Sequence, residues 1–522
     1  MWIPIAGAVF AFFASLGMGG NDVANSFATS VGAKALTLRQ VIVIASICEF
    51  SGAMLLGSKV TATIKESIVV GEYYEDNPAL LMFGMCIVLV GCAFWLIVAT
   101  WFELPVSSTH TCIGGMLGMA VISRGFKAIH WSTVINVICS WFYTPLLAGF
   151  ISFSLFWIIR RTVLTKDTSY TRSLALSSPL IAAVLFLNFF VLLNGGCPWF
   201  PALSYALAAL CSLGLSVVIA CLFRWLGLPR IRSRIEAPAS TSASAIAEDA
   251  TIYDSLLQND ASSAPQPAET SVPIPVSQPS EASEAKEASE AKEAKEAKEA
   301  GNLPVSNAAT GSTGGEDGKK SKEPKIGSQD VFARLKSDAT VATIHEHAEE
   351  FEPRTERMFV YLQVLAAVLN SFAHGANDVS HSMGPFAACI AIYNTGRIDD
   401  ASPCPAWILA LGAIGIIVGL ATMGYKVMAT VGVNLVRVTP CRGFFIELAA
   451  SVVVIVGSRL GMPLSTTQCK IGAAVGVGFV GGKEGVNWKL FLKIFAGWVV
   501  TIFIAALVSS LLMGFVIYAP RA

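Results

Sequence analysis

Long stretches without any charged residue constrain this sequence more than any other feature does. Asp, Glu, Lys and Arg are absent from the ranges 80–102, 133–159, 173–223, 401–425 and 494–520. A transmembrane helix needs about 20 consecutive apolar residues, so each range is long enough to cross a bilayer. The longest range contains Asn-Gly-Gly and two prolines near its middle and is interpreted as two spans. The sequence therefore predicts an all-α polytopic membrane protein.

The charged residues concentrate in one part of the chain. Of the 36 basic and 36 acidic residues, 37 lie between Gly227 and Glu356. The other 392 residues are only about 9% charged, against about 25% in an average soluble domain. A repeated Glu-Ala-Lys pattern with Ser-, Pro- and Gly-rich flanks offers too little apolar surface for a core. We therefore expect a low-complexity, largely disordered linker at 227–356, with transmembrane regions at 1–226 and 357–522.

The apolar segments and the basic residues beside them predict the number and direction of the spans. Seven apolar segments precede the linker and six follow it, and because some can be half-helices we expect about 10 to 12 spans. Basic residues near span ends prefer the cytoplasmic side. Such residues border the linker on both sides: Arg224, Arg230, Arg232, Arg234, Arg354 and Arg357. We therefore expect a cytosolic linker and, after seven crossings, an extracellular N-terminus.

The composition argues against several kinds of site. The 12 cysteines are scattered through apolar segments without CxxC pairs, which supports neither a disulfide framework nor a zinc site. The adjacent residues His345, Glu346 and His347 fall in the expected linker and make a poor metal site. No nucleophile–base pair or metal-ligand cluster recurs, so we expect no enzyme. We also expect no cofactor and no nucleic-acid partner.

An internal duplication is the most informative feature of the sequence. GGNDVANSF at 19–27 recurs as GANDVSHSM at 375–383, and GSKVTATI at 57–64 recurs as GYKVMATV at 424–431. LPVSSTHTCIGG at 104–115 recurs as MPLSTTQCKIGA at 462–473. Because the three motifs keep their order and nearly keep their spacing, the chain contains two copies of one structural unit.

The two copies follow different numbers of crossings, so the second copy would enter the membrane from the opposite side. Inverted-topology repeats of this kind are a recurring plan of secondary transporters, whose substrates bind near the midplane at helices interrupted by Gly or Pro. Here one motif is rich in Gly, and the other places a Pro before a hydroxyl cluster. We therefore expect two inverted repeats with broken or re-entrant helices around a central site.

Each copy carries an Asn-Asp pair in an otherwise apolar region, namely Asn21-Asp22 and Asn377-Asp378. A charged side chain at the bilayer centre costs at least about 2.5–3.5 kcal/mol. One such Asp could simply cap a helix start, but two at equivalent places favour cation ligands. We predict that both Asp bind the cation and that the neighbouring Asn and Gly belong to a broken helix. In the second copy the break would separate apolar segments near 358–373 and 383–393.

Each copy also carries three hydroxyl-bearing residues shortly after a Pro. These residues are Ser107, Ser108, Thr109, Ser465, Thr466 and Thr467. Hydroxyls and free N–H groups at a helix start can hold an anion without a charged side chain. Taken alone, the clusters could equally be N-caps or helix-contact residues. Repeated beside the Asn-Asp pairs, they predict an anion site.

The charges of these motifs suggest that an anion and a cation need each other. Neither motif core contains Arg or Lys, so a bound oxyanion would face two carboxylates. Small cations at Asp22 and Asp378 would offset that charge, and obligatory co-transport follows. Lys59, Lys426 and Lys470 have no position from sequence alone and could weaken this argument.

Two further carboxylates, Glu49 and Glu447, lie in apolar segments but not at equivalent positions of the repeat. Each is either a structural partner for a nearby Lys or part of an ion path. Together with His381 and Lys470 they form a group of candidates for a pathway or a structural role.

These motifs resemble the signatures of the PiT family of inorganic phosphate transporters, and the large intervening loop resembles its eukaryotic branch. GGNDVANSF with GANDVS, PVSSTH and GMPLSTTQCKIG carry the likeness, which covers both copies and the closing NWKLFLKIFAGW. The resemblance implies sodium-coupled uptake of inorganic phosphate by alternating access, with sodium as a co-substrate. It is compatible with a homodimer.

The resemblance also implies roles for individual residues. Asp22 and Asp378 would coordinate sodium with the neighbouring Asn side chains. Phosphate would be held by Asn25, by the same neighbouring Asn side chains and by the two hydroxyl clusters. The chain departs from the family pattern in having His381 where the second motif usually carries Asn. Because histidine titrates near neutral pH, His381 either makes transport pH-sensitive or serves as a neutral substitute for Asn.

Other functions stay open at this point. A proton-coupled phosphate or sulfate symporter of the same fold would use the same residue types. A membrane receptor or scaffold whose acidic linker binds partners would leave the twin Asp motifs unexplained. We therefore expect a multi-pass symporter embedded in the lipid bilayer of the plasma membrane.

Overall fold

The computed structural model describes residues 2–66, 69–195, 201–237, 338–398, 404–459 and 464–519. Within these ranges the chain is almost entirely helical, with one isolated β-bridge between Val69 and Ile129. Most of the expected linker lies outside the described residues.

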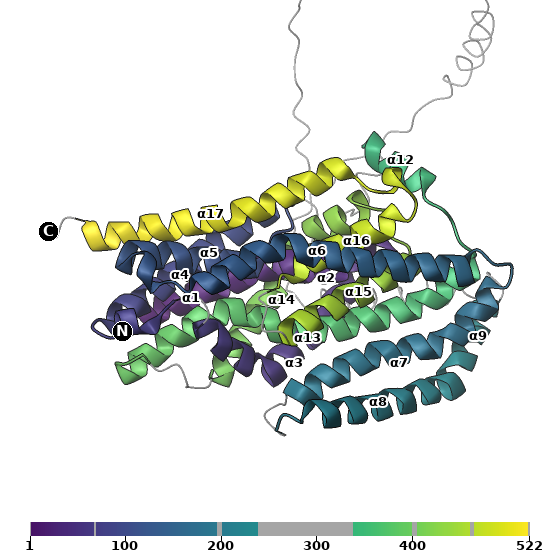
Figure 1. Cartoon of the computed structure of the whole chain (residues 1–522), viewed down its shortest axis with the longest axis horizontal. Helices are drawn as coiled ribbons and strands as arrows, with labels where there is room; N and C mark the ends of the chain where they lie inside the picture. The colour runs from purple at the N-terminus through teal and green to yellow at the C-terminus, as the bar shows by residue number, and fades with distance from the viewer. Residues whose placement is uncertain are drawn as a thin grey trace, which may run out of the picture. The chain divides into compact units, whose positions relative to one another are not determined.

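Figure 1 shows the arrangement of the helices. The first half contains α1 (Trp2–Met18), the π-helical turn η1 (Gly19–Val23), α2 (Ala24–Gly32), α3 (Leu38–Glu66), α4 (Pro78–Trp101), α5 (Ser108–Arg124), α6 (Trp131–Ile159), α7 (Ser169–Gly195), α8 (Tyr205–Leu222) and α9 (Leu228–Glu236). The second half contains α12 (Ala339–His347), α13 (Pro353–Thr395), α14 (Ala406–Ala429), the π-helical turn η7 (Thr430–Asn434), α15 (Pro440–Arg459), α16 (Thr466–Phe479) and α17 (Trp488–Tyr518). Short helical turns link several of these elements: η2 (Gly71–Tyr74), η3 (Phe126–Ala128), η4 (Arg160–Leu164), η5 (Phe223–Gly227) and η8 (Lys483–Gly485).

Nine helices in the described part of the chain are long and apolar enough to cross a membrane. They include α7 and α8, which divide the charge-free range 173–223 into two spans as expected. The shorter helices α5, α15 and α16 have 17, 20 and 14 residues. By length and composition, these helices confirm the prediction of an all-α polytopic membrane protein.

The prediction of a helix break at the two Asn-Asp pairs is wrong. The two segments predicted around the second pair belong to one helix, α13, of 43 residues. The first pair lies in η1, which joins α1 to α2 without leaving the helical conformation. The motif glycines allow close packing instead, because a Cβ on Gly19 would collide with the carbonyl of Ile416 and one on Gly375 with the backbone of Glu49.

The chain leaves the helical conformation instead just before the two hydroxyl clusters. Ser107 (φ −105°, ψ 123°) and Ser465 (φ −96°, ψ 119°) are extended and buried, and they cap α5 and α16. Each serine Oγ accepts a hydrogen bond from the backbone N–H three residues later, at 3.3 Å from His110 and 3.4 Å from Gln468. Both helices therefore begin inside the packed protein, with hydroxyl-bearing residues in their first turns.

The two copies of the repeat correspond helix by helix. The α1–α2 pair corresponds to α13, α3 to α14, α4 to α15, α5 to α16 and α6 to α17. The first helices of the two copies run in opposite directions. Gly7 of α1 lies against Phe386 of α13, and Ser15, farther along α1, hydrogen-bonds to Ser382 at 2.7 Å. The residue numbers thus rise along α1 while those of its contacts in α13 fall. An antiparallel pair of equivalent helices is the arrangement that an inverted repeat requires.

Each copy packs its last helix against the other copy. Figure 1 shows α17 running along α5 and α6 running along α16, and these two pairs are equivalent in the repeat. Both contacts depend on glycines four residues apart: Gly114 and Gly118 face α17, and Gly472 and Gly476 face α6. Small residues at this spacing let membrane helices approach closely.

The two ends of the expected linker are helical. α9 and α12 both lie within the range 227–356, and α13 already begins at Pro353. Residues 238–337 lie outside the described ranges. The sequence prediction thus overlooked short ordered helices at the borders of the low-complexity region.

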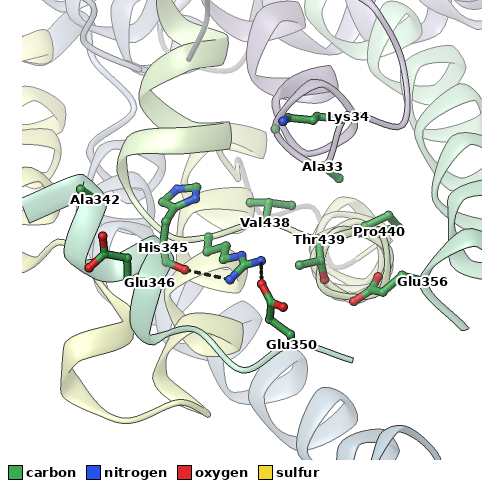
Figure 2. A pocket seen from close by; sticks show the side chains of 12 residues that line it. Ala33, Lys34, Ala342, His345, Glu346, Glu350, Glu356, Val438, Thr439 and Pro440 are labelled. Carbon is green, nitrogen blue, oxygen red and sulfur yellow. Dashed lines mark hydrogen bonds and ion pairs between the residues drawn. The ribbon is translucent and has the colours of Figure 1, made fainter. Parts of the chain in front are cut away.

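Helix α12 closes one side of a cavity of about 630 Å³ (Figure 2). The end of α2 and the segment before α15 form the other walls, and the lining residues include Lys34, His345, Glu350, Glu356 and Arg437. Arg437 donates hydrogen bonds to the carbonyl of His345 and to the carboxylate of Glu350, both at 2.8 Å. Burial lowers the pKa of His345. The C-terminal end of the linker range is thereby attached to the second copy of the repeat.

The glycine contacts generate a test of the packing. A Cβ at Gly118 would meet the carbonyl of Ala506, and one at Gly476 the carbonyl of Gly149. Because overpacking costs about 1–3 kcal/mol, Gly118→Val and Gly476→Val should each lower the thermal unfolding midpoint of the purified protein in detergent. The control Gly214→Val lies on α8, where no atom approaches within 4 Å of the added Cβ, and should unfold like the wild type. Equal midpoints for Gly118→Val and this control would contradict the packing.

Candidate functional site

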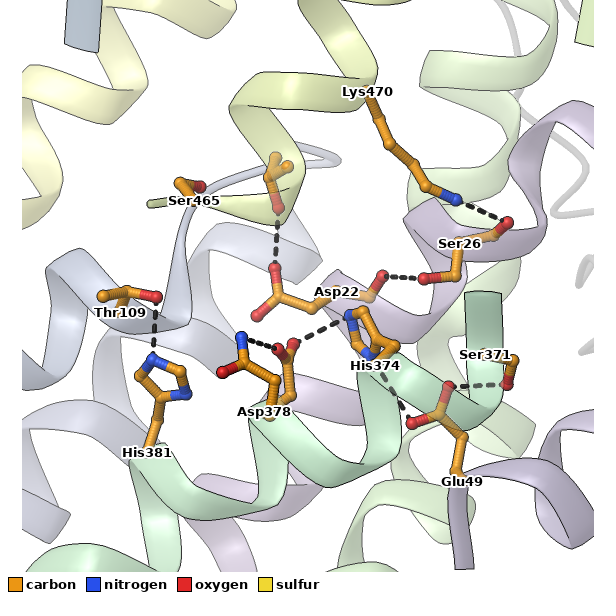
Figure 3. Close-up of polar contacts among 12 residues, drawn as sticks. Asp22, Ser26, Glu49, Thr109, Ser371, His374, Asp378, His381, Ser465 and Lys470 are labelled. Atoms are coloured by element: carbon orange, nitrogen blue, oxygen red, sulfur yellow. Dashed lines mark hydrogen bonds and ion pairs between the residues drawn. The ribbon is translucent and has the colours of Figure 1, made fainter. Parts of the chain in front are cut away.

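Two carboxylates from distant parts of the sequence lie together inside the packed helices. Asp22 in η1 and Asp378 in α13 are each only 2% exposed. Figure 3 shows their side chains facing one another. The structure thus brings together the two residues that the sequence predicts as cation ligands, one from each antiparallel copy.

The Asp22 carboxylate has one bonded and one open oxygen. Its Oδ1 accepts a hydrogen bond of 2.9 Å from the hydroxyl of Thr467, and Ser108 lies close to the same carboxylate. Its Oδ2 is buried and has no hydrogen-bond partner among the described residues. Buried carboxylate oxygens are normally paired, so this oxygen is available to a cation.

Asp378 has a histidine partner that the sequence analysis missed. His374 Nε2 lies 2.8 Å from Asp378 Oδ2, and its Nδ1 lies 3.2 Å from Glu49 Oε2. Ser371 donates a hydrogen bond of 2.7 Å to the other oxygen of Glu49. A neutral imidazole donates from one nitrogen only, whereas a protonated ring donates to both carboxylates. Among the described residues, Glu49 therefore has a histidine partner, where the sequence had offered either a nearby lysine or a place on an ion path.

The position of His374 could have been noticed in the sequence. It precedes Asp378 by four residues, and residues four apart lie on the same face of a helix. The expected helix break hid this relation, because it placed both residues in the interruption between two helical segments. The continuous helix α13 aligns them.

The hydroxyl residues reach the acidic motif of the opposite copy. Thr467 of the second copy bonds to Asp22 of the first. Thr109 of the first copy hydrogen-bonds with Nε2 of His381 in the second, at 2.8 Å. Thr466 lines a small cavity beside α13. The first turns of α5 and α16 therefore complete a site whose carboxylates come from the other copy.

The first motif Asn forms a structural clamp. Asn21 Nδ2 donates hydrogen bonds to Thr100 Oγ1 at 3.1 Å and to the carbonyl of Leu104 at 2.9 Å. Its Oδ1 accepts a hydrogen bond of 2.9 Å from the N–H of Val106. The Asn21 amide thereby fixes the extended segment that leads into α5.

The other motif amides differ from Asn21. Asn377 Nδ2 makes one long hydrogen bond of 3.5 Å to Asp378 Oδ1. The side chain of Asn25 lies outside the described residues. His381 stands at the position equivalent to Asn25, so the two halves of the site are not chemically equal.

A buried ion pair lies on α16 one helical turn beyond the hydroxyl cluster. Lys470 Nζ donates to both oxygens of Glu447, at 2.8 and 2.9 Å, and to the carbonyl of Ser26 at 2.9 Å. Thr29 and Asn370 donate further hydrogen bonds to Glu447, at 2.7 and 2.6 Å. Lys470 is 4% exposed and Glu447 is fully buried. Glu447 thus has the lysine partner that the sequence allowed for.

Of the three lysines that the sequence could not place, Lys470 contacts a residue of the first Asn-Asp motif, through the carbonyl of Ser26. Lys426 lies over the ring of Trp101, with Nζ 4.0 Å from the ring centroid. The side chain of Lys59 lies outside the described residues. Among the described lysine side chains, that of Lys470 therefore places a fixed positive charge next to the site.

Comparison with known proteins decides the family. Residues 18–509 match the phosphate transporter family. The chain belongs to this family. The sodium-dependent phosphate transporter 1-A of Danio rerio is 29% identical over 99% of this chain and 95% of its own length. The phosphate-repressible phosphate permease pho-4 of Neurospora crassa is 30% identical over 99% of this chain and 97% of its own length.

The fold agrees with the family. A solved structure of a sodium-dependent phosphate transporter superposes with a TM-score of 0.70 and 26% identity, covering 100% of both chains. The resemblance that the motifs indicate is thereby confirmed. The chain is a multi-pass membrane protein of the phosphate transporter family.

The charges buried in this phosphate transporter favour a cation. Four buried carboxylates lie in two neighbouring groups. The described side chains near them that can carry positive charge are one lysine and two histidines of α13. The carboxylates are those of Asp22, Glu49, Asp378 and Glu447, and the positive side chains are Lys470, His374 and His381. Taking a charge out of water without a partner costs several kcal/mol. A cation at the open oxygen of Asp22 would lower this cost.

The Lys470–Glu447 pair generates a stability test. Lys470→Met leaves the Glu447 carboxylate buried and unpaired, which should cost about 3–5 kcal/mol. Replacing Glu447 by Met as well should recover most of the loss, because no unpaired charge then remains. Thermal unfolding in detergent measures both effects. Arg232→Met removes an exposed pair with Glu236 and should leave the unfolding midpoint close to that of the wild type, because solvent screens exposed ion pairs. A Lys470→Met protein as stable as this control would refute the buried pair.

Proposed function

We propose that this chain is a sodium-coupled symporter that imports inorganic phosphate by alternating access. The observation that carries the proposal is the pair Asp22 and Asp378, two buried carboxylates that face each other from opposite copies. The names of the relatives, sodium-dependent phosphate transporters, support sodium as the coupling ion and phosphate as the substrate. Sodium is then a co-substrate, and the chain transports without acting as an enzyme.

Electrostatics supplies the coupling. With both Asp ionised and no cation bound, an incoming phosphate meets like charge in a medium of low dielectric constant. Sodium at the open oxygen of Asp22 and at Asp378 cancels that charge. The hydroxyls of Thr109 and Thr467, in the first turns of α5 and α16, can then bind the oxyanion. Phosphate entry without sodium is unfavourable for the same reason.

The antiparallel copies support alternating access. In transporters built from inverted repeats, one half moves against the other around a fixed site. Here the contacts Thr467–Asp22 and Thr109–His381 each join one copy to the other. A relative movement of the copies therefore changes both contacts together, which links opening of the site to release of its ligands.

The orientation in the membrane follows from the basic residues at the span ends. We place the linker in the cytosol and the N-terminus outside the cell, because Arg224, Arg230 and Arg354 lie beside the linker. In this orientation the two inverted repeats enter the membrane from opposite sides. We place the protein in the plasma membrane, where imported phosphate would reach the cytosol, and a homodimer is compatible with this arrangement.

Proton coupling is the second candidate, because His374 and His381 both contact the site. Uptake of labelled phosphate into liposomes containing the purified protein separates the two. A sodium gradient without a pH gradient should drive accumulation, and excess unlabelled phosphate, but not sulfate, should compete. Uptake that follows a pH gradient and ignores sodium would overturn the sodium assignment.

Neutralising either carboxylate should abolish coupling. Asp22→Asn and Asp378→Asn should each lower sodium-driven phosphate uptake by about 100-fold or more, because losing one partner of a buried ionic contact costs about 2–5 kcal/mol. Uptake is compared per molecule inserted in the membrane. The control Asp76→Asn changes an exposed carboxylate paired with Arg124 and should transport normally. Near-normal uptake by either site variant would remove that carboxylate from the mechanism.

The linker should be dispensable for transport itself. Deleting residues 250–327, which lie outside the described ranges, removes none of the site residues and should leave uptake per molecule close to that of the full chain. The measurement is again labelled phosphate uptake, normalised to the amount of protein in the membrane. Loss of uptake at a normal membrane level would show that the linker takes part.

A further inference from the structure

A small cavity lies next to the paired carboxylates, between α13, α15 and α16. Its volume is about 40 Å³, and its polar lining residues are Asn370, His374, Asn377, Thr466 and Lys470. A cavity needs about 10–15 Å³ to hold one water, so this one has room for a few waters or for part of an oxyanion. It adjoins the carboxylate site through His374, which also touches Asp378.

Helical spacing places donor groups on two walls of this cavity. Thr466 and Lys470 are four residues apart and share a face of α16, and Asn370, His374 and Asn377 share a face of α13. α15 contributes only apolar side chains. The ammonium, amide and hydroxyl groups can donate hydrogen bonds, whereas both nitrogens of His374 face carboxylates. None of the described lining residues is Asp or Glu, and this chemistry suits an oxyanion.

Lys470 supplies a fixed positive charge, which the cores of the two motifs lack because they contain no Arg or Lys. Its ammonium has three N–H donors, and all three are used by the two oxygens of Glu447 and the carbonyl of Ser26. Glu447 therefore neutralises Lys470 in this conformation. Because Thr29 and Asn370 also donate to Glu447, its carboxylate keeps two hydrogen bonds when Lys470 turns away.

We propose that the cavity is an oxyanion subsite on the phosphate path and that Lys470 exchanges Glu447 for phosphate. The inference rests on the proposed function and deepens it, since it names the residue that balances part of the phosphate charge apart from sodium. Glu447 acts as an internal competitor that holds Lys470 while phosphate is absent. The exchange keeps the lysine paired in both states, so its buried charge is never left alone.

Direct binding of labelled inorganic phosphate to the full chain in lipid nanodiscs at saturating sodium tests this subsite. The double variant Lys470→Met/Glu447→Met removes both charges and leaves no unpaired buried ion. It should bind phosphate at least tenfold more weakly, while binding of labelled sodium without phosphate stays as in the wild type. Wild-type phosphate affinity in the double variant would overturn the proposal, because the pair would then be structural only.

A second variant tests the exchange and does not depend on the double variant folding. Glu447→Gln removes the competing charge and keeps an oxygen acceptor for Thr29 and Asn370. Because Lys470 is then released, the affinity for phosphate should rise at least threefold. An unchanged or lower affinity would overturn the exchange.

The controls separate this inference from the proposed function. Arg232→Met/Glu236→Met removes an exposed Arg–Glu ion pair on α9, far from the cavity in sequence, and should bind phosphate like the wild type. Failure of the wild-type protein to bind phosphate at saturating sodium would count against the proposed function as a whole. A loss of phosphate binding that is confined to the Lys470→Met/Glu447→Met variant supports the subsite.

Discussion

Holding carboxylates inside a membrane-embedded bundle of helices is the constraint on which the rest of this structure depends. The buried acids are stabilised by three kinds of partner. Asp22 uses a threonine hydroxyl, Asp378 and Glu49 share a histidine, and Glu447 is paired with a lysine. These partners come from helices of both copies, so the charge balance of the site depends on how the two copies pack against each other. A transporter that couples ions needs this sensitivity, because binding a cation then changes the stability of contacts between the moving parts.

The glycines serve this constraint indirectly. Where α5 meets α17 and α6 meets α16, the backbones approach closely enough that a side chain on the glycine would collide with the facing helix. The same holds at Gly19 and Gly375, beside the two Asn-Asp pairs. Close approach excludes water and lipid from around the carboxylates. Electrostatic contacts at the site are strengthened accordingly.

Sequence reasoning was sufficient for the family, the helical class and the identity of the paired acids. Those conclusions need only charge scarcity, a duplication and the residue types within it. It was insufficient for the path of the chain through the motifs, because Gly next to Asn permits both a helix break and close helix packing. Asn21 shows the same limit: its type suits a ligand, but its amide is used by Thr100, Leu104 and Val106.

The sequence supplied the partners of the buried charges only in part. Lys470 and Glu447 are near each other in the chain, yet their pairing depends on how α15 and α16 pack, and Thr29 joins them from the other copy. His374 was overlooked because its relation to Asp378 exists only in a continuous helix. Contacts between side chains hundreds of residues apart leave no pattern in a single sequence.

The crossed contacts between the copies carry a consequence for how such a protein can originate. One copy alone has an acid without its threonine and a threonine without its acceptor. A half-length ancestor could therefore assemble this site only as two chains inserted in opposite orientations. Joining the two halves in one gene fixes their orientations and lets each half change separately. The histidine at position 381, equivalent to Asn25 in the other half, is one such difference between the halves.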